Sequence, residues 1–280
     1  MRRAMCAAIA VLVGASVAVV ATPAWAVPGL VAVTVTSAEV GSESFKGANA
    51  VCPAGTKIVG GGADVLGGGH SVRIAGINPA PLLPNPNSLW ATAHEDVLGY
   101  SGVWSLRAWA ICASGVTGWQ VVLADNTGPT NGYAFATASC PAGKKVIGAG
   151  GRSTGKPSVV LDSINIAADL SSVTVEVVAI NGATPIAYAY AICINPVPRQ
   201  QRVALNKQPG SDDQTLALSC PEGTKTHGVG GGMTAAVGQS YLDELAPNGA
   251  SLTGVYIDAR EDATGNPFSW SVNLQAVCAG

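Results

Sequence analysis

One short phrase, repeated three times, constrains the fold of this chain more than any other feature of its sequence. The pattern C-P-x-G-x-K-x-x-G-x-G begins at Cys52, Cys140 and Cys220. A second phrase, which ends in cysteine, closes each copy: AWAIC at Cys112, AYAIC at Cys193 and LQAVC at Cys278. The sequence therefore predicts three copies of one unit, over residues 27–117, 118–199 and 200–280, after a leader at 1–26.

The six repeat cysteines predict three disulfide bonds. An even number of cysteines in an exported chain is typical of a disulfide framework. Fifteen pairings are possible in principle, but a repeated unit is expected to bond within itself. We therefore expect the pairs Cys52–Cys112, Cys140–Cys193 and Cys220–Cys278.

The last segment of each repeat has the period of a β-strand. Small apolar residues alternate with larger or polar ones before the closing cysteine, for example Ala108 and Ala110 on one face and Arg107 and Trp109 on the other. A period of two indicates a strand with one buried side. Comparable apolar stretches recur throughout each copy, and they predict about six strands per repeat and an all-β chain.

Glycine and proline in the opening phrase predict a turn and a tightly packed strand. In the Pro-x-Gly turn, proline fixes its own φ and Gly55 accepts a positive φ. The glycines eight and ten residues after each opening cysteine lie on one face of the next strand. Glycine at such positions indicates close backbone approach or a β-bulge.

Three all-β repeats allow two architectures. The first is a pseudo-threefold β-prism of antiparallel sheets, which would form one domain. The alternative is three small β-sandwiches in tandem. The short junctions between repeats contain no Ser/Pro-rich linker, and they favour the prism.

Composition excludes several classes of protein. The chain is 48% hydrophobic and only 11% charged, and its formal net charge is −2. Intrinsic disorder requires the opposite balance, and nucleic-acid binding is typical of a basic surface. We therefore expect no nucleic-acid partner. The oligomeric state is not predicted.

The N-terminus predicts export. Two arginines, Arg2 and Arg3, precede an apolar run over 4–20, and Ala24-Trp25-Ala26 has the small-x-small form of a cleavage site. These are the parts of a secretory signal peptide. No later segment reaches the about 20 apolar residues that a membrane-spanning helix needs, so we expect a secreted, extracellular protein.

The repeat phrase resembles one found in secreted actinobacterial proteins. The CPAGxKxxGGG opening and the AxAIC closing carry this resemblance, which covers the chain from Cys52 to Cys278. More distantly, three C-P-x-G units resemble the vitelline membrane outer layer protein family, and this likeness implies a β-prism and a link to carbohydrate. The present chain is much longer than members of that family.

Acidic pairs are the first candidates for ligand binding. Glu95 and Asp96 follow His94, and the third repeat has Glu261 and Asp262 after Arg260. Their second-repeat counterpart is expected at Ala179-Ile180-Asn181. Such carboxylates suit Ca²⁺ or sugar hydroxyls, although Ca²⁺ requires six or more oxygens. A solvated turn is the alternative interpretation.

A further acidic pair falls at matching positions of two repeats. Asp162 and Asp243 correspond, where the first repeat has Ala75. They are interpreted either as paired sugar sites or as hydrogen-bonded aspartates at strand ends.

Outward-facing aromatic residues are the second group of candidates. Trp109, Tyr188 and Tyr190 fall on the outer phase of the closing strands. Exposed rings stack on the apolar faces of sugars, whereas ordinary packing is the alternative interpretation. Trp104 and Trp270 match each other and are expected in the core.

No catalytic, cofactor or metal motif occurs in the sequence. His70 follows three glycines and is interpreted as an exposed loop residue. His227 replaces Val59 and Ile147 of the other repeats and is interpreted as a structural substitution. We therefore expect no enzyme, no cofactor and no metal. The sequence predicts a secreted, non-catalytic, lectin-like protein that binds polysaccharide or cell-surface glycan. The alternative is a structural extracellular or surface-coat protein without a small ligand.

Overall fold

The protein is built from strands. The computed structural model describes residues 27–38, 43–79, 87–236 and 238–280, and in these ranges the chain forms eighteen strands and no helix. The all-β prediction and the six strands per repeat are confirmed. The predicted signal peptide, 1–26, lies outside the described residues. No helix of the described part of the chain is long and apolar enough to cross a membrane.

The strands have the following bounds. Repeat 1 contributes β1 (Val31–Thr36), β2 (Phe45–Val51), β3 (Lys57–Leu66), β4 (Val72–Pro79), β5 (Ser88–Glu95) and β6 (Ser105–Ala113). Repeat 2 contributes β7 (Gln120–Thr127), β8 (Tyr133–Ser139), β9 (Lys145–Arg152), β10 (Val159–Ile166), β11 (Ser172–Ala179) and β12 (Ile186–Ile194). Repeat 3 contributes β13 (Gln201–Asn206), β14 (Gln214–Ser219), β15 (Lys225–Thr234), β16 (Ser240–Pro247), β17 (Gly254–Glu261) and β18 (Ser271–Ala279).

Each of the three antiparallel sheets combines strands of two repeats. Sheet A has the order β1-β6-β3-β16-β17-β14, sheet B the order β2-β5-β4-β9-β12-β7, and sheet C the order β13-β18-β15-β10-β11-β8. Every repeat thus gives its first, sixth and third strands to one sheet and its second, fifth and fourth strands to another. The repeats interlock as a pseudo-threefold β-prism, and none has a complete sheet of its own, as three tandem sandwiches would require.

The two halves of each sheet meet at a short seam between a third and a fourth strand. In sheet A, Asp64 of β3 pairs with Glu244 of β16. In sheet B, Gly76 pairs with Arg152, and in sheet C, Ser163 pairs with Gly232. These seams bring together residues that lie far apart in the sequence.

Small residues on the inner faces of the closing strands form the centre of the core. The inner phase of β6, β12 and β18 is fully buried, as its alternating pattern predicts: Leu106, Ala108, Ala110, Ala187, Ala189, Ala191, Leu274 and Ala276. Trp104 and Trp270 are also buried, with 1% and 0% of their surface exposed. The prediction that these two tryptophans belong to the core is confirmed.

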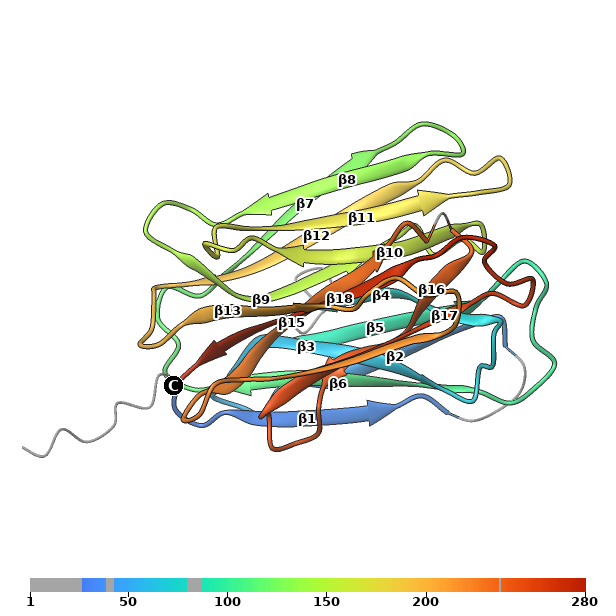
Figure 1. Ribbon diagram of the computed structural model, residues 1–280. Helices are drawn as coiled ribbons and strands as arrows, with labels where there is room; N and C mark the ends of the chain where they lie inside the picture. Colours follow the sequence, from blue (N-terminus) through green and yellow to red (C-terminus); the bar gives the residue numbers. More distant parts are fainter. Residues whose placement is uncertain (1–26, 39–42, 80–86, 237) are drawn as a thin grey trace, which may run out of the picture.

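The first glycine of the repeated G-x-G lies where the three third strands meet. β3, β9 and β15 run side by side in the middle of the molecule (Figure 1). A Cβ on Gly60 would collide with the carbonyl of His227, one on Gly148 with the carbonyl of Val59, and one on Gly228 with the carbonyl of Ile147. Val59, Ile147 and His227 are themselves the bulged residues of these strands. Both expectations for this position, close approach and a bulge, are confirmed.

The second glycine of G-x-G allows the seams to form. A Cβ on Gly62 would meet the backbone of Leu245 in β16, and one on Gly150 would meet the backbone of Ile77 in β4. Gly230 lies in the same way against Ile164 of β10. Because each contact joins two different repeats, the motif is required by the assembly of the prism rather than by any one repeat.

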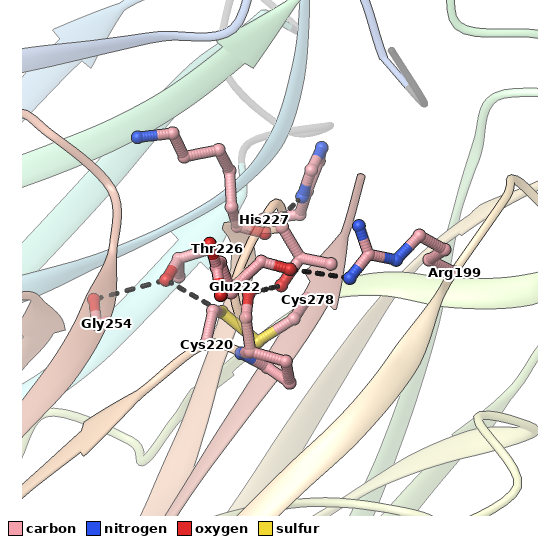
Figure 2. Close-up of a disulfide and its surroundings, with 10 residues drawn as sticks. Arg199, Cys220, Glu222, Thr226, His227, Gly254 and Cys278 are labelled. Atoms are coloured by element: carbon pink, nitrogen blue, oxygen red, sulfur yellow. Dashed lines mark hydrogen bonds between the residues drawn. A yellow bond between two sulfur atoms is a disulfide. The ribbon is translucent and has the colours of Figure 1, made fainter. Parts of the chain in front are cut away.

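The opening turn and the disulfide bonds hold the end of each repeat. Gly55, Gly143 and Gly223 have φ values of 79°, 81° and 70°, and each turn closes through a backbone hydrogen bond such as Thr56 N–H to Pro53 C=O. The structure forms the disulfides Cys52–Cys112, Cys140–Cys193 and Cys220–Cys278, as the repeats predict. Figure 2 shows the third, where Thr226 donates a hydrogen bond to the Gly254 carbonyl beside the sulfur atoms.

Candidate functional site

A row of charged side chains crosses the outer face of sheet A at its seam. Arg107, Asp64, Glu244 and Asp258 are successive cross-strand partners on β6, β3, β16 and β17. We call these four residues the sheet A row. Cross-strand partners share a face of the sheet, so the row gathers one cation and three carboxyls. In a chain with only 11% charged residues, this concentration marks the candidate site.

One end of the row holds a tryptophan in a fixed orientation. Asp64, which is only 2% exposed, accepts a hydrogen bond from Arg107 Nε at 2.9 Å and another from Trp109 Nε1 at 3.1 Å. The Arg107 guanidinium also lies 5.4 Å from the centre of the Trp109 ring. The ring is half-buried, so it offers apolar surface to the solvent beside charged groups.

The other end of the row is closed by a second arginine. Arg260 Nη2 lies 3.0 Å from the Asp258 carboxylate and 2.9 Å from that of Asp243. A β-bulge between Leu242 and Glu244 in β16 places Asp243 beside the row. The prediction that Asp243 lies at a strand end is wrong, because Asp243 occupies a bulge in the middle of β16.

Burial changes the acidity of two carboxyl groups here. Burial, and then repulsion from Asp64, raises the pKa of Glu244 to about 7. Burial likewise raises the pKa of Asp243 to about 8, against the opposing attraction of Arg260. A carboxyl group that is partly protonated at neutral pH can both donate a hydrogen bond to a ligand hydroxyl and accept one from it.

In sheet B, the positions equivalent to Asp64 and Arg107 hold a cationic and an aromatic residue. Arg152 pairs with Tyr188 across β9 and β12, and its guanidinium carbon lies 3.7 Å from the centre of the Tyr188 ring. Arg152 Nε also donates a hydrogen bond to the Tyr190 hydroxyl at 3.2 Å. The expectation of an exposed ring at Tyr190 is wrong, because the residue is only 2% exposed. Tyr188 is half-buried, and a binding role for either tyrosine stays a prediction.

The equivalent position in sheet C is mostly uncharged. Asn273 and Gln275 of β18 replace Arg107 and Trp109 of β6. Gln275 Nε2 donates hydrogen bonds to the side-chain oxygens of Asn165 and Asn273, both at 3.0 Å. Glu176 of β11 pairs with Ser163 and occupies the position in sheet C that Asp258 of β17 occupies in sheet A.

The acidic pairs that the sequence singles out lie at loop entrances. The Glu95 carboxylate accepts hydrogen bonds from Trp104 Nε1 at 3.2 Å and from the Tyr100 backbone N–H at 3.1 Å. Asp96 accepts the backbone N–H groups of Leu98 and Gly99. These groups already use internal partners, and ligand binding by them stays a prediction.

The third repeat repeats this arrangement. Glu261 accepts hydrogen bonds from Trp270 Nε1 at 2.9 Å and from the Asn266 backbone N–H at 3.1 Å, and Asp262 accepts from Thr264. The assignment of Ala179-Ile180-Asn181 to the second repeat is wrong by one residue. Val160 and Tyr241 are equivalent, since each lies two residues before the aspartate at the bulge. Val178 pairs with Val160 and Arg260 pairs with Tyr241. The counterpart of Arg260-Glu261-Asp262 is therefore Val178-Ala179-Ile180.

Two histidines are buried and one is exposed. Burial lowers the pKa of both His94 and His227 to about 4, so both are neutral at pH 7. His227 Nδ1 lies 2.9 Å from the Lys225 carbonyl (Figure 2). His70 is an exposed loop residue, as expected, and its Nδ1 lies 3.0 Å from the Glu261 carbonyl. No group of three or more His, Cys, Asp or Glu side chains suited to a metal occurs among the described residues.

Sequence reasoning placed Trp109 and Arg107 on the outer face but missed the acidic part of the row. Asp64 and Glu244 belong to different repeats, and neither carries a local motif. The available signal was the alignment of the repeats, in which Asp64 corresponds to Arg152 and to Gly232. That alignment shows a variable outer position, but it does not show which fourth strand would lie beside it.

The comparisons with known proteins add no family to this picture. No family model matches the chain, and no curated protein matches it. The resemblances drawn from the repeat phrase therefore remain expectations.

Proposed function

We propose that this chain is a secreted, non-catalytic binding protein for polysaccharide, with Trp109 and the sheet A row as its main contact surface. The observation that carries the proposal is the half-buried Trp109 ring, fixed by its hydrogen bond to Asp64 beside charged side chains. An aromatic ring supplies the apolar surface on which a sugar stacks. Carboxyl and guanidinium groups then hydrogen-bond the hydroxyls at the rim of the sugar.

Two further features support the proposal. Three disulfide bonds are typical of proteins in oxidising compartments, which agrees with export. The rigid sheet, rather than a loop, carries the binding groups, so little conformational entropy is lost when a ligand binds.

A sedimentation assay with a panel of insoluble polysaccharides tests this function. Trp109→Ala is expected to weaken binding at least about tenfold, which corresponds to about 1.4 kcal/mol. Trp109→Phe keeps the ring and is expected to retain most of the binding. Trp90→Ala removes another half-buried tryptophan outside the row and serves as the matched control. Equal binding by all variants, or binding by none of the proteins, would refute the proposal.

A structural coat protein is the second candidate, and the edge strands favour it. Tyr133 and Phe135 on β8, at the edge of sheet C, are 39% and 50% exposed, and their rings stack 6.2 Å apart. Exposed apolar edge strands promote pairing between chains. Self-association that Phe135→Lys abolishes, together with no polysaccharide binding, would favour this candidate.

A further inference from the structure

The same β-bulge in the fourth strand of two repeats carries an aspartate, but only one of the two has a cationic partner. In repeat 3, Asp243 lies 2.9 Å from Arg260 Nη2. In repeat 2, the bulge in β10 falls between Leu161 and Ser163 and presents Asp162. The first repeat has Ala75 at this position and carries no charge there.

Repeat 2 lacks the arginine that would neutralise Asp162. The strand register places Val178 of β11 where repeat 3 has Arg260 of β17. Asp162 is nevertheless only 5% exposed, and no hydrogen bond joins its carboxyl group to another described residue. A buried carboxylate without a partner is costly, and two things relieve that cost: protonation of the carboxyl group or a cation from outside the chain.

A hollow lies beside Asp162. Its volume is about 210 Å³, and its lining includes Asp162, Glu176, Tyr133, Asn165, Thr234 and Asn273. Roughly 10–15 Å³ are enough for one water molecule, so the hollow has room for a much larger polar group. We call it the sheet C hollow.

The amide side chains in and beside the hollow already have hydrogen-bond partners. Asn165 donates to Ser163 Oγ at 2.8 Å, and Gln275 donates to the side-chain oxygens of both Asn165 and Asn273. Asn273 in turn donates to the Gly232 carbonyl at 3.3 Å. Among the lining residues, Asp162 is therefore a buried polar group left without a partner, whereas the Tyr133 and Thr234 hydroxyls lie at exposed positions and Glu176 is half-buried.

The electrostatics of the hollow are those of an acidic pair without a counter-ion. Burial, and then repulsion from Glu176, raises the pKa of Asp162 well above its ordinary value. Burial raises the pKa of Glu176. Burial, followed by the two carboxylates, raises the pKa of Tyr133. The other lining residues, from β10, β15, β18 and the segment after β15, carry no titratable group.

We propose that the sheet C hollow binds a cationic amino group, which takes the place beside Asp162 that the Arg260 guanidinium has beside Asp243. The exposed hydroxyl groups of Tyr133 and Thr234 at the hollow suit a ligand in which the ammonium is flanked by hydroxyls, as in an amino sugar with a free amine. This assignment rests on the proposed polysaccharide-binding function, and it gives one sheet a preference for deacetylated amino-sugar units.

Calorimetry with glucosamine oligomers and with the matching N-acetylated oligomers tests the inference. The free-amine oligomer is expected to bind at least tenfold more tightly, because acetylation removes the positive charge. Asp162→Asn keeps the shape of the side chain and is expected to lower affinity for the free-amine oligomer about tenfold. Glu176→Gln, at a half-buried position, is expected to lower it as well, and both variants are checked for an unchanged circular dichroism spectrum.

A matched control separates the hollow from the net charge of the protein. Asp169→Asn makes the same carboxyl-to-amide replacement at an exposed loop position, where the carboxylate accepts the Ser171 backbone N–H. This variant is expected to bind as the wild type does.

Several outcomes would overturn the inference. The first two are equal affinity for free-amine and acetylated oligomers and full affinity of the Asp162→Asn variant for the free-amine oligomer. The others are equally tight binding of a lysine peptide and binding of Ca²⁺ alone that depends on Asp162.

Failure of the hollow is distinguishable from failure of the proposed function. Binding of neutral polysaccharide that depends on Trp109, without amine binding, refutes only the hollow. Amine binding through Asp162, without any binding that depends on Trp109, refutes only the role of the sheet A row.

Discussion

The carbonyl group of His227 in β15 occupies the space that a side chain on Gly60 in β3 would need. Gly148 and Gly228 have the same relationship to Val59 and Ile147, so the three third strands contact one another through backbone atoms in a closed cycle. A backbone carbonyl in a packed core cannot move aside as a flexible side chain does. The first glycine of the repeat is therefore needed by all three repeats at once.

Replacing this glycine should destabilise the whole prism. Gly60→Ala is expected to lower the free energy of unfolding by more than about 3 kcal/mol, because overpacking against a backbone forces the strands apart. Gly182→Ala is the control, since it has open space around it and a φ of 78°, and its expected cost is about 1 kcal/mol. Urea unfolding measures both, and equal losses would contradict the close approach at the centre.

The Pro-x-Gly turn makes a different demand on its glycine. Gly55 has no atom within 4 Å of an added Cβ, but its φ is 79°. Gly55→Val is therefore expected to destabilise through backbone strain alone, whereas Gly55→Asn should cost less because asparagine tolerates this conformation. Lys57→Ala loses only the contact of its ammonium with Trp119, at 5.2 Å, worth about 0.5–1 kcal/mol. Thermal unfolding ranks the three variants, and equal melting temperatures for Gly55→Val and Lys57→Ala would exclude the turn assignment.

The buried histidine at the centre should make stability depend on pH. Burial lowers the pKa of His227 to about 4, so below about pH 6.5 the unfolded chain binds a proton that the folded chain does not. Stability is therefore lost as the pH falls from about 6.5 to about 4, by about 3 kcal/mol for this group. His227→Val, which restores the residue type of Val59, should remove this part of the loss. Parallel stability curves for the two proteins over this range would show that His227 does not contribute.

Glu261 has two competing roles, as a structural acceptor and as a ligand-binding carboxylate. It accepts the indole N–H of the buried Trp270 at 2.9 Å, as Glu95 does for Trp104. Glu261→Gln weakens this charge-assisted hydrogen bond and should cost about 1–2 kcal/mol of stability. Loss of polysaccharide binding at unchanged stability would instead support the ligand role.

Local sequence features determined the parts of this fold that depend on neighbouring residues. The period-two pattern before Cys112, Cys193 and Cys278 predicted strands with a small buried face, because alternation is a property of each strand by itself. Pro53 and Gly55 predicted the turn through their own backbone preferences. The threefold repetition predicted the disulfide pairs, since equivalent units make equivalent bonds.

Only the tertiary structure decided which repeats share a sheet and what each seam brings together. Asp64 lies beside Glu244 because hydrogen bonds between the backbones of different repeats set the register of β3 against β16. Those bonds involve main-chain groups that are the same in every residue, so the sequence carries no local signal for them. The burial of Tyr190 depends on pairing within repeat 2, where Arg152 on β9 donates a hydrogen bond to its hydroxyl. A strand pattern shows which face a side chain occupies, but neighbours that arrive through long-range pairing decide whether that face is exposed.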